Sequence, residues 1–144
     1  MDPTEFIEVA EQLLEDGDEP HLRTAVSRAY YGAFHVARRF LQNCGVEVPR
    51  SDVHDKLRWC LQQSGSQDLE IASRQLDALR AERNKADYDL NDARFKKASR
   101  ARLQVKTARA IVASVDSSRA GPHYSLVRER VCDYAGKVLA WRVV

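Results

Sequence analysis

The sequence lacks any apolar run that approaches the roughly 18 residues a membrane span needs. Its acidic start also lacks the basic and apolar regions of a signal peptide. We therefore expect a cytoplasmic protein that makes no membrane contact. At 144 residues, the chain is most simply one domain, and it is long enough to bury a hydrophobic core.

Cysteine and histidine are scarce, and neither is spaced as a set of metal ligands. The three cysteines show no CxxC or CxxH spacing, and the four histidines show no HxxxH or HExxH pattern. We expect buried, reduced thiols, no metal site and no cofactor. The sequence also has no glycine-rich phosphate loop, no G-x-S-x-G elbow and no paired-carboxylate signature.

The small net charge of +2 hides an uneven distribution of charge along the chain. Residues 1–19 hold eight acidic residues and no Lys or Arg, whereas residues 94–142 hold twelve Lys or Arg and three acidic residues. This asymmetry favours a basic surface that binds phosphates or an acidic partner. A solvated helix face is the alternative interpretation.

The most informative stretch runs from Leu22 to Cys44, where apolar residues recur at steps of three and four. These residues are Leu22, Val26, Ala29, Ala33, Ala37, Phe40 and Cys44. Small alanines that alternate with aromatic residues allow neighbouring helices to approach closely. The pattern predicts the central helix of a bundle, with a basic and aromatic face on its opposite side.

Similar periodicity predicts helices on both sides of this stretch. They are expected over residues 2–17, 51–63, 69–90 and 92–115, followed by a last helix from His123 to Trp141. We therefore predict an all-α antiparallel bundle of four core helices with a short helix and an extra C-terminal helix. The expected organisation is a bundle over residues 1–116, a linker over 117–122, and a C-terminal helix over 123–144 that packs on the bundle or on a partner.

One charged residue occupies an apolar slot in the expected helix over residues 69–90. Arg83 continues a stripe formed by Leu69, Ala72, Leu76, Leu79, Ala86 and Leu90. Burying an unpaired guanidinium is very costly, so Arg83 must be paired or face a shared interface. Asp87 is one turn further along the helix and within reach.

Two segments, SRAYYGAFHVARRFL and LRAERNKADYDL, resemble the HEPN family (higher eukaryotes and prokaryotes nucleotide-binding domain), and the resemblance covers roughly Leu13 to Val115. It implies an antiparallel helical bundle that is usually dimeric and often encoded beside a minimal nucleotidyltransferase. Many members of the family are metal-independent endoribonucleases that use an Arg-x(4–6)-His motif, and others are non-catalytic.

This sequence departs from that motif, because Arg83 and Asn84 match its start but residues 88–90 are Tyr-Asp-Leu, without a histidine. Cleaving RNA without a metal requires a base for the 2′-hydroxyl and an acid for the leaving oxygen. Tyr88, with an ordinary pKa of about 10, is a poor base at neutral pH. Asp87 would be weakened as a base by pairing with Arg83.

Three interpretations therefore stay open for this group. The first is an atypical ribonuclease whose candidate catalytic residues are Arg83, Asn84, Asp87 and Tyr88. The second is a buried ion pair with a tyrosine packed at a dimer seam. The third is a ligand-binding site without chemistry.

Two other groups are candidates for binding a nucleotide or RNA. Arg28, Tyr31 and His35 share one strip of the central helix, and together they offer a cation, a stacking ring and an imidazole. The alternative for this strip is an exposed face that contacts the last helix. A second candidate is the basic strip of the fifth helix, formed by Arg102, Lys106 and Arg109.

From these features we expect a HEPN-like binding module of a nucleotidyltransferase-linked or toxin–antitoxin type system, which contacts nucleotide, RNA or a partner protein and is not an enzyme. The alternatives are an atypical metal-independent endoribonuclease with a composite site at a dimer interface, and a purely structural helical dimer. The expected partners are a second copy of the chain and a nucleotidyltransferase-type protein.

Overall fold

The structure is a computed structural model that describes residues 1–144. It contains six α-helices and one short 3-10 helix. They are α1 (Thr4–Asp16), α2 (Glu19–Asn43), α3 (His54–Gln62), α4 (Gln67–Tyr88), η1 (Ala93–Lys96), α5 (Ala98–Ala120) and α6 (Tyr124–Lys137). The all-α class that the periodicity predicts is therefore confirmed. No helix combines the length and the apolar character that crossing a bilayer requires.

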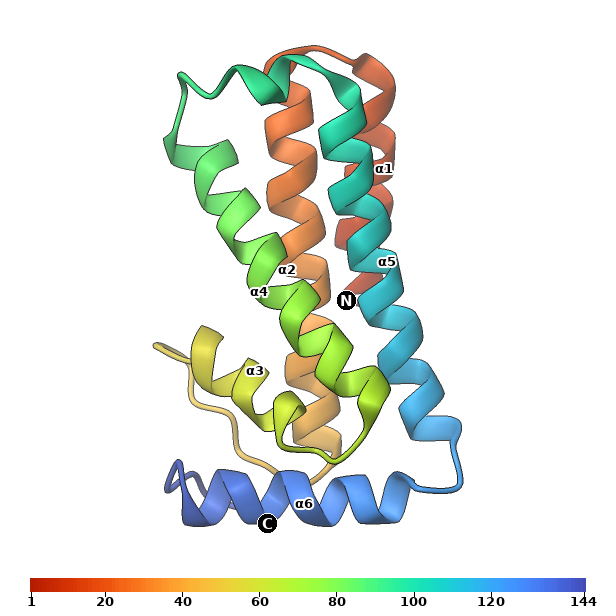
Figure 1. Ribbon diagram of the computed structural model, residues 1–144, viewed down its shortest axis with the longest axis vertical. Coiled ribbons are helices and arrows are strands. Elements are labelled where there is room, and N and C mark those ends of the chain that lie inside the picture. The colour runs from red at the N-terminus through yellow and green to blue at the C-terminus, as the bar shows by residue number, and fades with distance from the viewer.

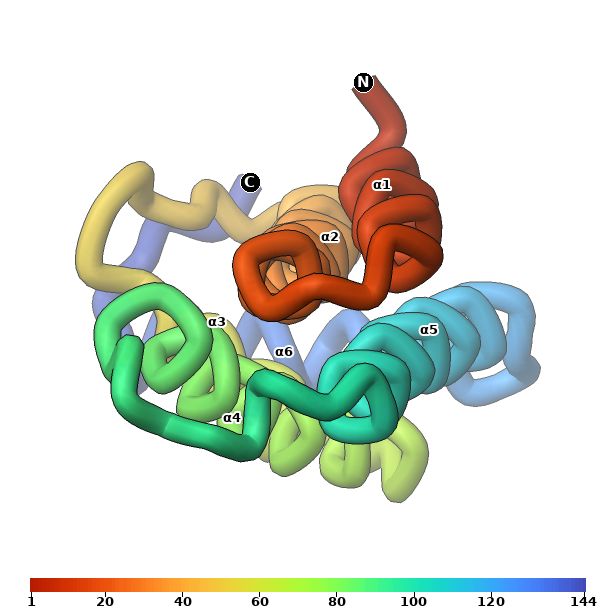
Figure 2. The backbone as a smooth tube through the Cα atoms, turned by 90° about the horizontal axis from the view of Figure 1, so that it is seen from above, coloured from red at the N-terminus to blue at the C-terminus, as the bar shows by residue number.

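The four long helices form an antiparallel bundle. Figure 1 shows α1, α2, α4 and α5 running alternately up and down along the long axis of the molecule. α3 lies beside the lower half of α4, and α6 crosses the bottom of the bundle (Figure 1). Seen from above, α2 lies centrally, with α1, α4 and α5 around it (Figure 2). The predicted bundle with a short helix and an added C-terminal helix is thus present.

Local sequence signals set several of the helix ends. At the start of α2, the carboxylate of Asp18 accepts a hydrogen bond of 3.1 Å from the backbone N–H of His21. At the start of α4, the hydroxyl of Ser66 accepts one of 3.3 Å from the backbone N–H of Leu69. These caps satisfy N–H groups that have no partner within their helix. Gly17 ends α1 with a φ of 71°, a left-handed conformation that glycine adopts without strain.

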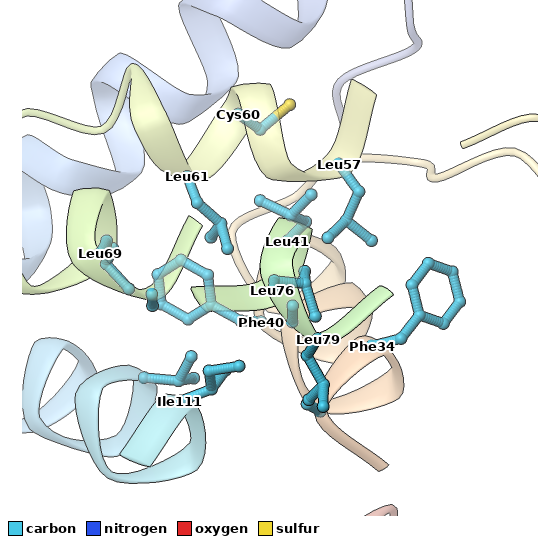
Figure 3. Packing of buried hydrophobic residues seen from close by; sticks show 14 of the residues in the cluster. Phe34, Phe40, Leu41, Leu57, Cys60, Leu61, Leu69, Leu76, Leu79 and Ile111 are labelled. Carbon is cyan, nitrogen blue, oxygen red and sulfur yellow. The ribbon is translucent and has the colours of Figure 1, made fainter. Parts of the chain in front are cut away.

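A cluster of 29 buried residues forms the core, and α2 runs through its middle. The alanines that the spacing assigns to the core face of α2 are buried, and Figure 3 shows large side chains of α3, α4 and α5 gathered around those of α2. The contact with α1 is closer still. A Cβ at Gly32 of α2 would lie 2.5 Å from Cγ1 of Ile7, so the two helices leave no room for a side chain there.

A buried arginine of α2, Arg23, closes the C-terminal end of α4. Its guanidinium donates hydrogen bonds of 2.9 to 3.3 Å to four backbone carbonyls, those of Lys85, Ala86, Asp89 and Asp92. The carbonyl of Ala86, near the end of α4, has no backbone donor, so Arg23 supplies one, and Arg23 adds a second donor to the other three carbonyls. Glu19 neutralises its charge with an oxygen 2.9 Å from Nη2.

The C-terminal part of the chain differs from the expected organisation. α5 continues to Ala120, so residues 117–120 of the expected 117–122 linker are helical. None of these four residues breaks a helix, and the first helix-breaking residues that follow them are Gly121 and Pro122. The last helix covers Tyr124–Lys137 and not the whole of 123–144.

Residues 138–144 form a tail that turns back onto the bundle. The N–H of Trp141 donates to the carbonyl of Ala135 at 2.9 Å, and the N–H of Val144 donates to that of Gly45 at 2.7 Å. Trp141 is 9% exposed. Trp141 therefore packs against the core from the tail, whereas its spacing predicts a position on the apolar stripe of the last helix.

The three cysteines lie where α3 and α6 meet the end of α2. All are free, and Cys44 and Cys60 are buried whereas Cys132 is half-buried. Burial raises the pKa of each thiol, to about 12 for Cys60. The thiols therefore stay protonated and poorly nucleophilic at neutral pH.

Candidate functional site

The side chain of Arg83 is nine-tenths buried, as its slot in the apolar stripe of α4 predicts. Its guanidinium carbon lies 5.1 Å from the ring centre of Tyr30 and 5.3 Å from that of Tyr31. The carboxylate of Asp87 is distant, with Oδ2 3.9 Å from Nη1 of Arg83. Because aromatic faces attract cations, the two tyrosines hold this guanidinium in place more than the expected ion pair does.

The hydrogen-bonding capacity of this arginine is largely unused. Nε of Arg83 is buried and has no partner, and the same is true of Nε of Arg80, one turn earlier on α4. Arg80 makes a single ion pair, with Nη1 3.3 Å from Oδ1 of Asp55. A buried donor without a partner costs ~1–3 kcal/mol, and most buried polar atoms have one. Two such donors on neighbouring cations favour the binding of an anion beside them.

The other candidate catalytic residues do not all meet at Arg83. Asp87 lies next to it, where the hydroxyl of Ser27 donates to Oδ2 of Asp87 at 3.3 Å. Asn84 is exposed, and Tyr88, the last residue of α4, is 76% exposed. Five residues of α-helix rotate a side chain by about 140° around the axis. Tyr88 therefore points away from Arg83 within one chain.

Arg28, Tyr31 and His35 lie together on one side of α2, as their spacing predicts, and Phe6 of α1 joins them. The guanidinium carbon of Arg28 lies 5.5 Å from the ring centre of Phe6 and 5.0 Å from that of Tyr31. The His35 ring is stacked at 6.0 Å from Phe6 and 6.5 Å from Tyr31. We refer to these four residues as the α2 strip. They are half-buried, so their contacts fix them while solvent still reaches them.

A cavity of about 360 Å³ opens next to the α2 strip. It is lined by Met1, Pro3, Phe6, His35, Arg38, Arg39 and Gln42. Arg38 and Arg39 each donate a hydrogen bond of 3.0 Å to a backbone carbonyl, and neither forms an ion pair with a carboxylate. Burial and these two cations lower the pKa of His35. The cavity is therefore electropositive and suits a phosphate group.

A second histidine, His54, lies near the α2 strip and contacts residues of α2. His54, the first residue of α3, stacks on Phe34 with the ring centres 4.5 Å apart, and its Nδ1 is hydrogen-bonded to the hydroxyl of Tyr30. Burial, followed by Arg80 and Arg83, lowers the pKa of His54.

The spacing of apolar residues in α3 indicates the orientation of His54. His54 precedes Leu57 and Leu61, both fully buried, by three and seven residues, which places it on the same face of α3. The direction of the face follows from this spacing. The identity of the neighbours on α2 and α4 does not, because they are distant in the sequence.

The basic strip on α5 is a separate surface. Arg102 and Lys106 are exposed, whereas Arg109 forms an ion pair with Glu11 of α1 that raises the pKa of Arg109. Glu11 and Phe6 are five residues apart on α1 and so lie on different sides of that helix, about 140° from one another. The structure thus does not bring the α5 strip and the α2 strip together.

The side chains gathered here can bind an anion and stack on a ring. Cations, stacking rings and imidazoles line the region, and no group of three or more His, Cys, Asp and Glu side chains is placed to hold a metal ion. Cations can hold a phosphate and rings can stack on a base. Metal-independent RNA cleavage would in addition need an acid and a base on opposite sides of one phosphate.

Comparison with known proteins gives one match. The family model described as HEPN domain matches residues 4–118, from the start of α1 almost to the end of α5. The α2 strip, His54 and Arg83 all lie inside the matched part, and α6 lies outside it. No match is found among the curated proteins or among the solved structures.

Proposed function

Because the chain belongs to the HEPN domain family, we propose that it is a module that binds a nucleotide or single-stranded RNA without cleaving it. The observation that carries the proposal is the α2 strip, in which the guanidinium of Arg28 contacts the rings of Phe6 and Tyr31. The base of the ligand stacks on these rings, and a phosphate enters the electropositive cavity beside His35.

Stacking and charge act together on such a ligand. A base that stacks on an aromatic side chain contributes ~1–3 kcal/mol, whatever its identity. Arg38 and Arg39, which form no ion pair with a carboxylate, add attraction for the backbone phosphates. Both interactions tolerate many sequences, so the proposed module recognises a class of ligand and not one RNA sequence.

The absence of cleavage is proposed from the position of Tyr88. Its ring is 76% exposed and rotated away from Arg83 around α4, so neither it nor Asn84 works with Arg83 within one protomer. An endoribonuclease with a composite site would need the second copy of the chain to complete it. RNA that stays intact in EDTA is the expected result.

The same end of α4 supports the proposed homodimer. Tyr88 and Leu90 are 76% and 72% exposed, large apolar surfaces that a second copy can cover. Leu90 also lines a cavity of about 390 Å³ between α2 and α4. As part of the proposal, this dimer belongs to a nucleotidyltransferase-linked or toxin–antitoxin type system, in which the ligand or a nucleotidyltransferase-type partner binds the module.

The test is binding of a fluorescein-labelled single-stranded RNA followed by fluorescence anisotropy. Tyr31→Leu removes a stacking ring and is expected to weaken binding about tenfold. Arg38→Gln removes a cation that lines the cavity and is expected to lower the salt dependence of binding by about one phosphate contact. Lys106→Gln on α5 changes an exposed cation outside the α2 strip and serves as the matched control.

Two outcomes would contradict the proposal. If Lys106→Gln weakened binding as much as the two α2 variants, the α5 strip would be the binding surface. If wild-type protein cleaved the RNA in EDTA, and Arg83→Met abolished cleavage with the helical content unchanged, the module would be a ribonuclease.

A further inference from the structure

Behind the α2 strip, Arg80, Arg83 and His54 lie near Tyr30. The guanidinium carbon of Arg83 is 5.1 Å from the Tyr30 ring centre, and Nδ1 of His54 is hydrogen-bonded to the Tyr30 hydroxyl. Arg80 and Arg83 influence both of these groups. They lower the pKa of His54 together with burial. They also act to lower the pKa of Tyr30, but burial outweighs them and raises it. Two cations and an imidazole therefore share one small region.

Two buried donors in this region, one on each arginine, have no partner within the chain. Arg83 is 8% exposed, its Nε is unpartnered, and its contact with Asp87 is a long one of 3.9 Å. Nε of Arg80 is also buried and unpartnered. We infer that Arg80, Arg83 and His54 form a subsite for a terminal phosphate, the monoester group at the end of a nucleotide or an RNA strand. This inference rests on the proposed function and names the end of the ligand that the site selects.

The charge of the surroundings is compatible with an anion. Asp55 pairs with Arg80 and Arg58, and Asp87 faces Arg83, but the side chains of these carboxylates are 51% and 29% exposed. Water therefore screens them more than it screens Arg83. At His54 the influence of the two arginines exceeds that of Asp55, so the potential there is positive.

The buried rings beside His54 and the charge of a chain end favour a terminal phosphate over the middle of a strand. Tyr30 and Phe34, which flank His54, are 1% and 6% exposed and form a closed wall. An internal phosphodiester continues in two directions and needs an open groove on both sides. A terminal monoester continues in one direction only, and its second negative charge can be matched by a second cation.

The Tyr30–His54 hydrogen bond orients the imidazole toward such a ligand. Burial raises the pKa of Tyr30, so its hydroxyl keeps its proton, and one tautomer of the neutral His54 ring accepts a hydrogen bond from it at Nδ1. The ring proton then lies on Nε2, where it can be donated to a phosphate oxygen. A bound anion also favours the charged imidazolium, so binding takes up protons.

The sign of the pH dependence follows from this coupling. In the free protein, His54 faces Arg80 and Arg83 of α4, His35 and Tyr30 of α2, and Asp55 of its own helix, and its pKa lies below 6.5. Because a bound phosphate raises this pKa, the preference for a phosphorylated end increases as the pH falls from 8 to about 6.5. Below about 6 the phosphate itself takes up a proton and the preference declines again.

The experiment uses one single-stranded RNA sequence in three forms, with a 5′-phosphate, with a 3′-phosphate, and with hydroxyl groups at both ends, each labelled at an end that carries no phosphate or internally. Anisotropy titrations with the full chain give the affinity of each. We expect one phosphorylated form to bind about tenfold more tightly than the hydroxyl form, as charge-assisted hydrogen bonds predict. His54→Gln and Arg80→Gln are expected to remove this preference, and Arg74→Gln, an exposed cation on α4, is expected to retain it.

The outcomes separate this inference from the proposed function. Equal, measurable affinity of wild type for all three forms would overturn the terminal-phosphate subsite and leave the module as an RNA binder. Absence of binding to every form would overturn both. The comparison among RNA forms uses wild-type protein, so it stands even if a variant at position 54 or 80 unfolds.

Discussion

Replacing two buried arginines by methionine distinguishes a structural cation from a functional one. Arg23 and Arg83 are 7% and 8% exposed, so burial alone does not separate them. Methionine matches much of the length of an arginine side chain and removes the charge and the donors. We expect Arg23→Met to destabilise the fold strongly and Arg83→Met to leave it nearly unchanged.

The magnitudes follow from what each guanidinium contacts. Arg23 donates to four carbonyls and pairs with Glu19. Removing one member of such a buried network costs about 3–5 kcal/mol, because Glu19 and the carbonyl of Ala86 lose their partners. Arg83 loses its attraction to two tyrosine rings, worth about 0.5–2 kcal/mol each, and a methionine regains part of this by packing on the same rings. Asp87 keeps its hydrogen bond from Ser27, so the net change is expected within about 1 kcal/mol.

The assay is urea unfolding followed by far-UV circular dichroism at pH 7, with the free energy of unfolding extrapolated to water. RNA binding of the same samples is measured by anisotropy, where Arg83→Met is expected to lose affinity despite its intact fold. If Arg83→Met lost as much stability as Arg23→Met, Arg83 would be a structural residue and the reasoning from its unpartnered donors would be wrong.

Three further predictions concern packing, assembly and acid stability. Gly32→Ala is expected to destabilise the protein by ~1–3 kcal/mol in urea unfolding, because its Cβ would lie 2.5 Å from Ile7. In Gly136→Ala the nearest atom, in Val143, lies at 3.6 Å, so this variant should stabilise α6 by about 1 kcal/mol. Multi-angle light scattering at micromolar concentration is expected to give the mass of a dimer, and a monomer would contradict the proposed assembly. The free energy of unfolding should fall as the pH drops below 6.5, since burial lowers the folded-state pKa of His35 and His54, and His54→Gln should make that fall shallower.

Local periodicity was sufficient to predict the helices and their buried faces. The seven repeating apolar residues from Leu22 to Cys44 and those of the stripe from Leu69 to Ala86 are buried, because the position around a helix axis depends only on sequence spacing. Leu90 was predicted to continue the stripe, but it lies beyond the end of α4 and is 72% exposed. The position of the C-terminal tail could not be predicted in the same way. Trp141 has the spacing of a helical stripe, but backbone hydrogen bonds of the tail with residues 45–47 place it, and no local pattern indicates such a pairing.

The candidate site shows the same division between local and long-range information. The slot of Arg83 and the common side of Arg28, Tyr31 and His35 follow from helical spacing. The contribution of His54 does not, since it depends on where the loop after α2 directs the start of α3. Arg23 was likewise missed as a structural cation, because its partners lie more than sixty residues away along the chain.

The way in which a buried arginine is held determines whether it remains available to a ligand. Arg23 is held by carbonyls and a carboxylate, which occupy its donors and neutralise its charge. Arg83 is held by the faces of two tyrosine rings, which fix its position without accepting its hydrogen bonds. An anion that reaches Arg83 therefore meets a positioned cation with free donors and displaces no internal hydrogen bond. This is the physical reason why we place recognition of the terminal phosphate at Arg83, even though the histidine of the ribonuclease motif is absent.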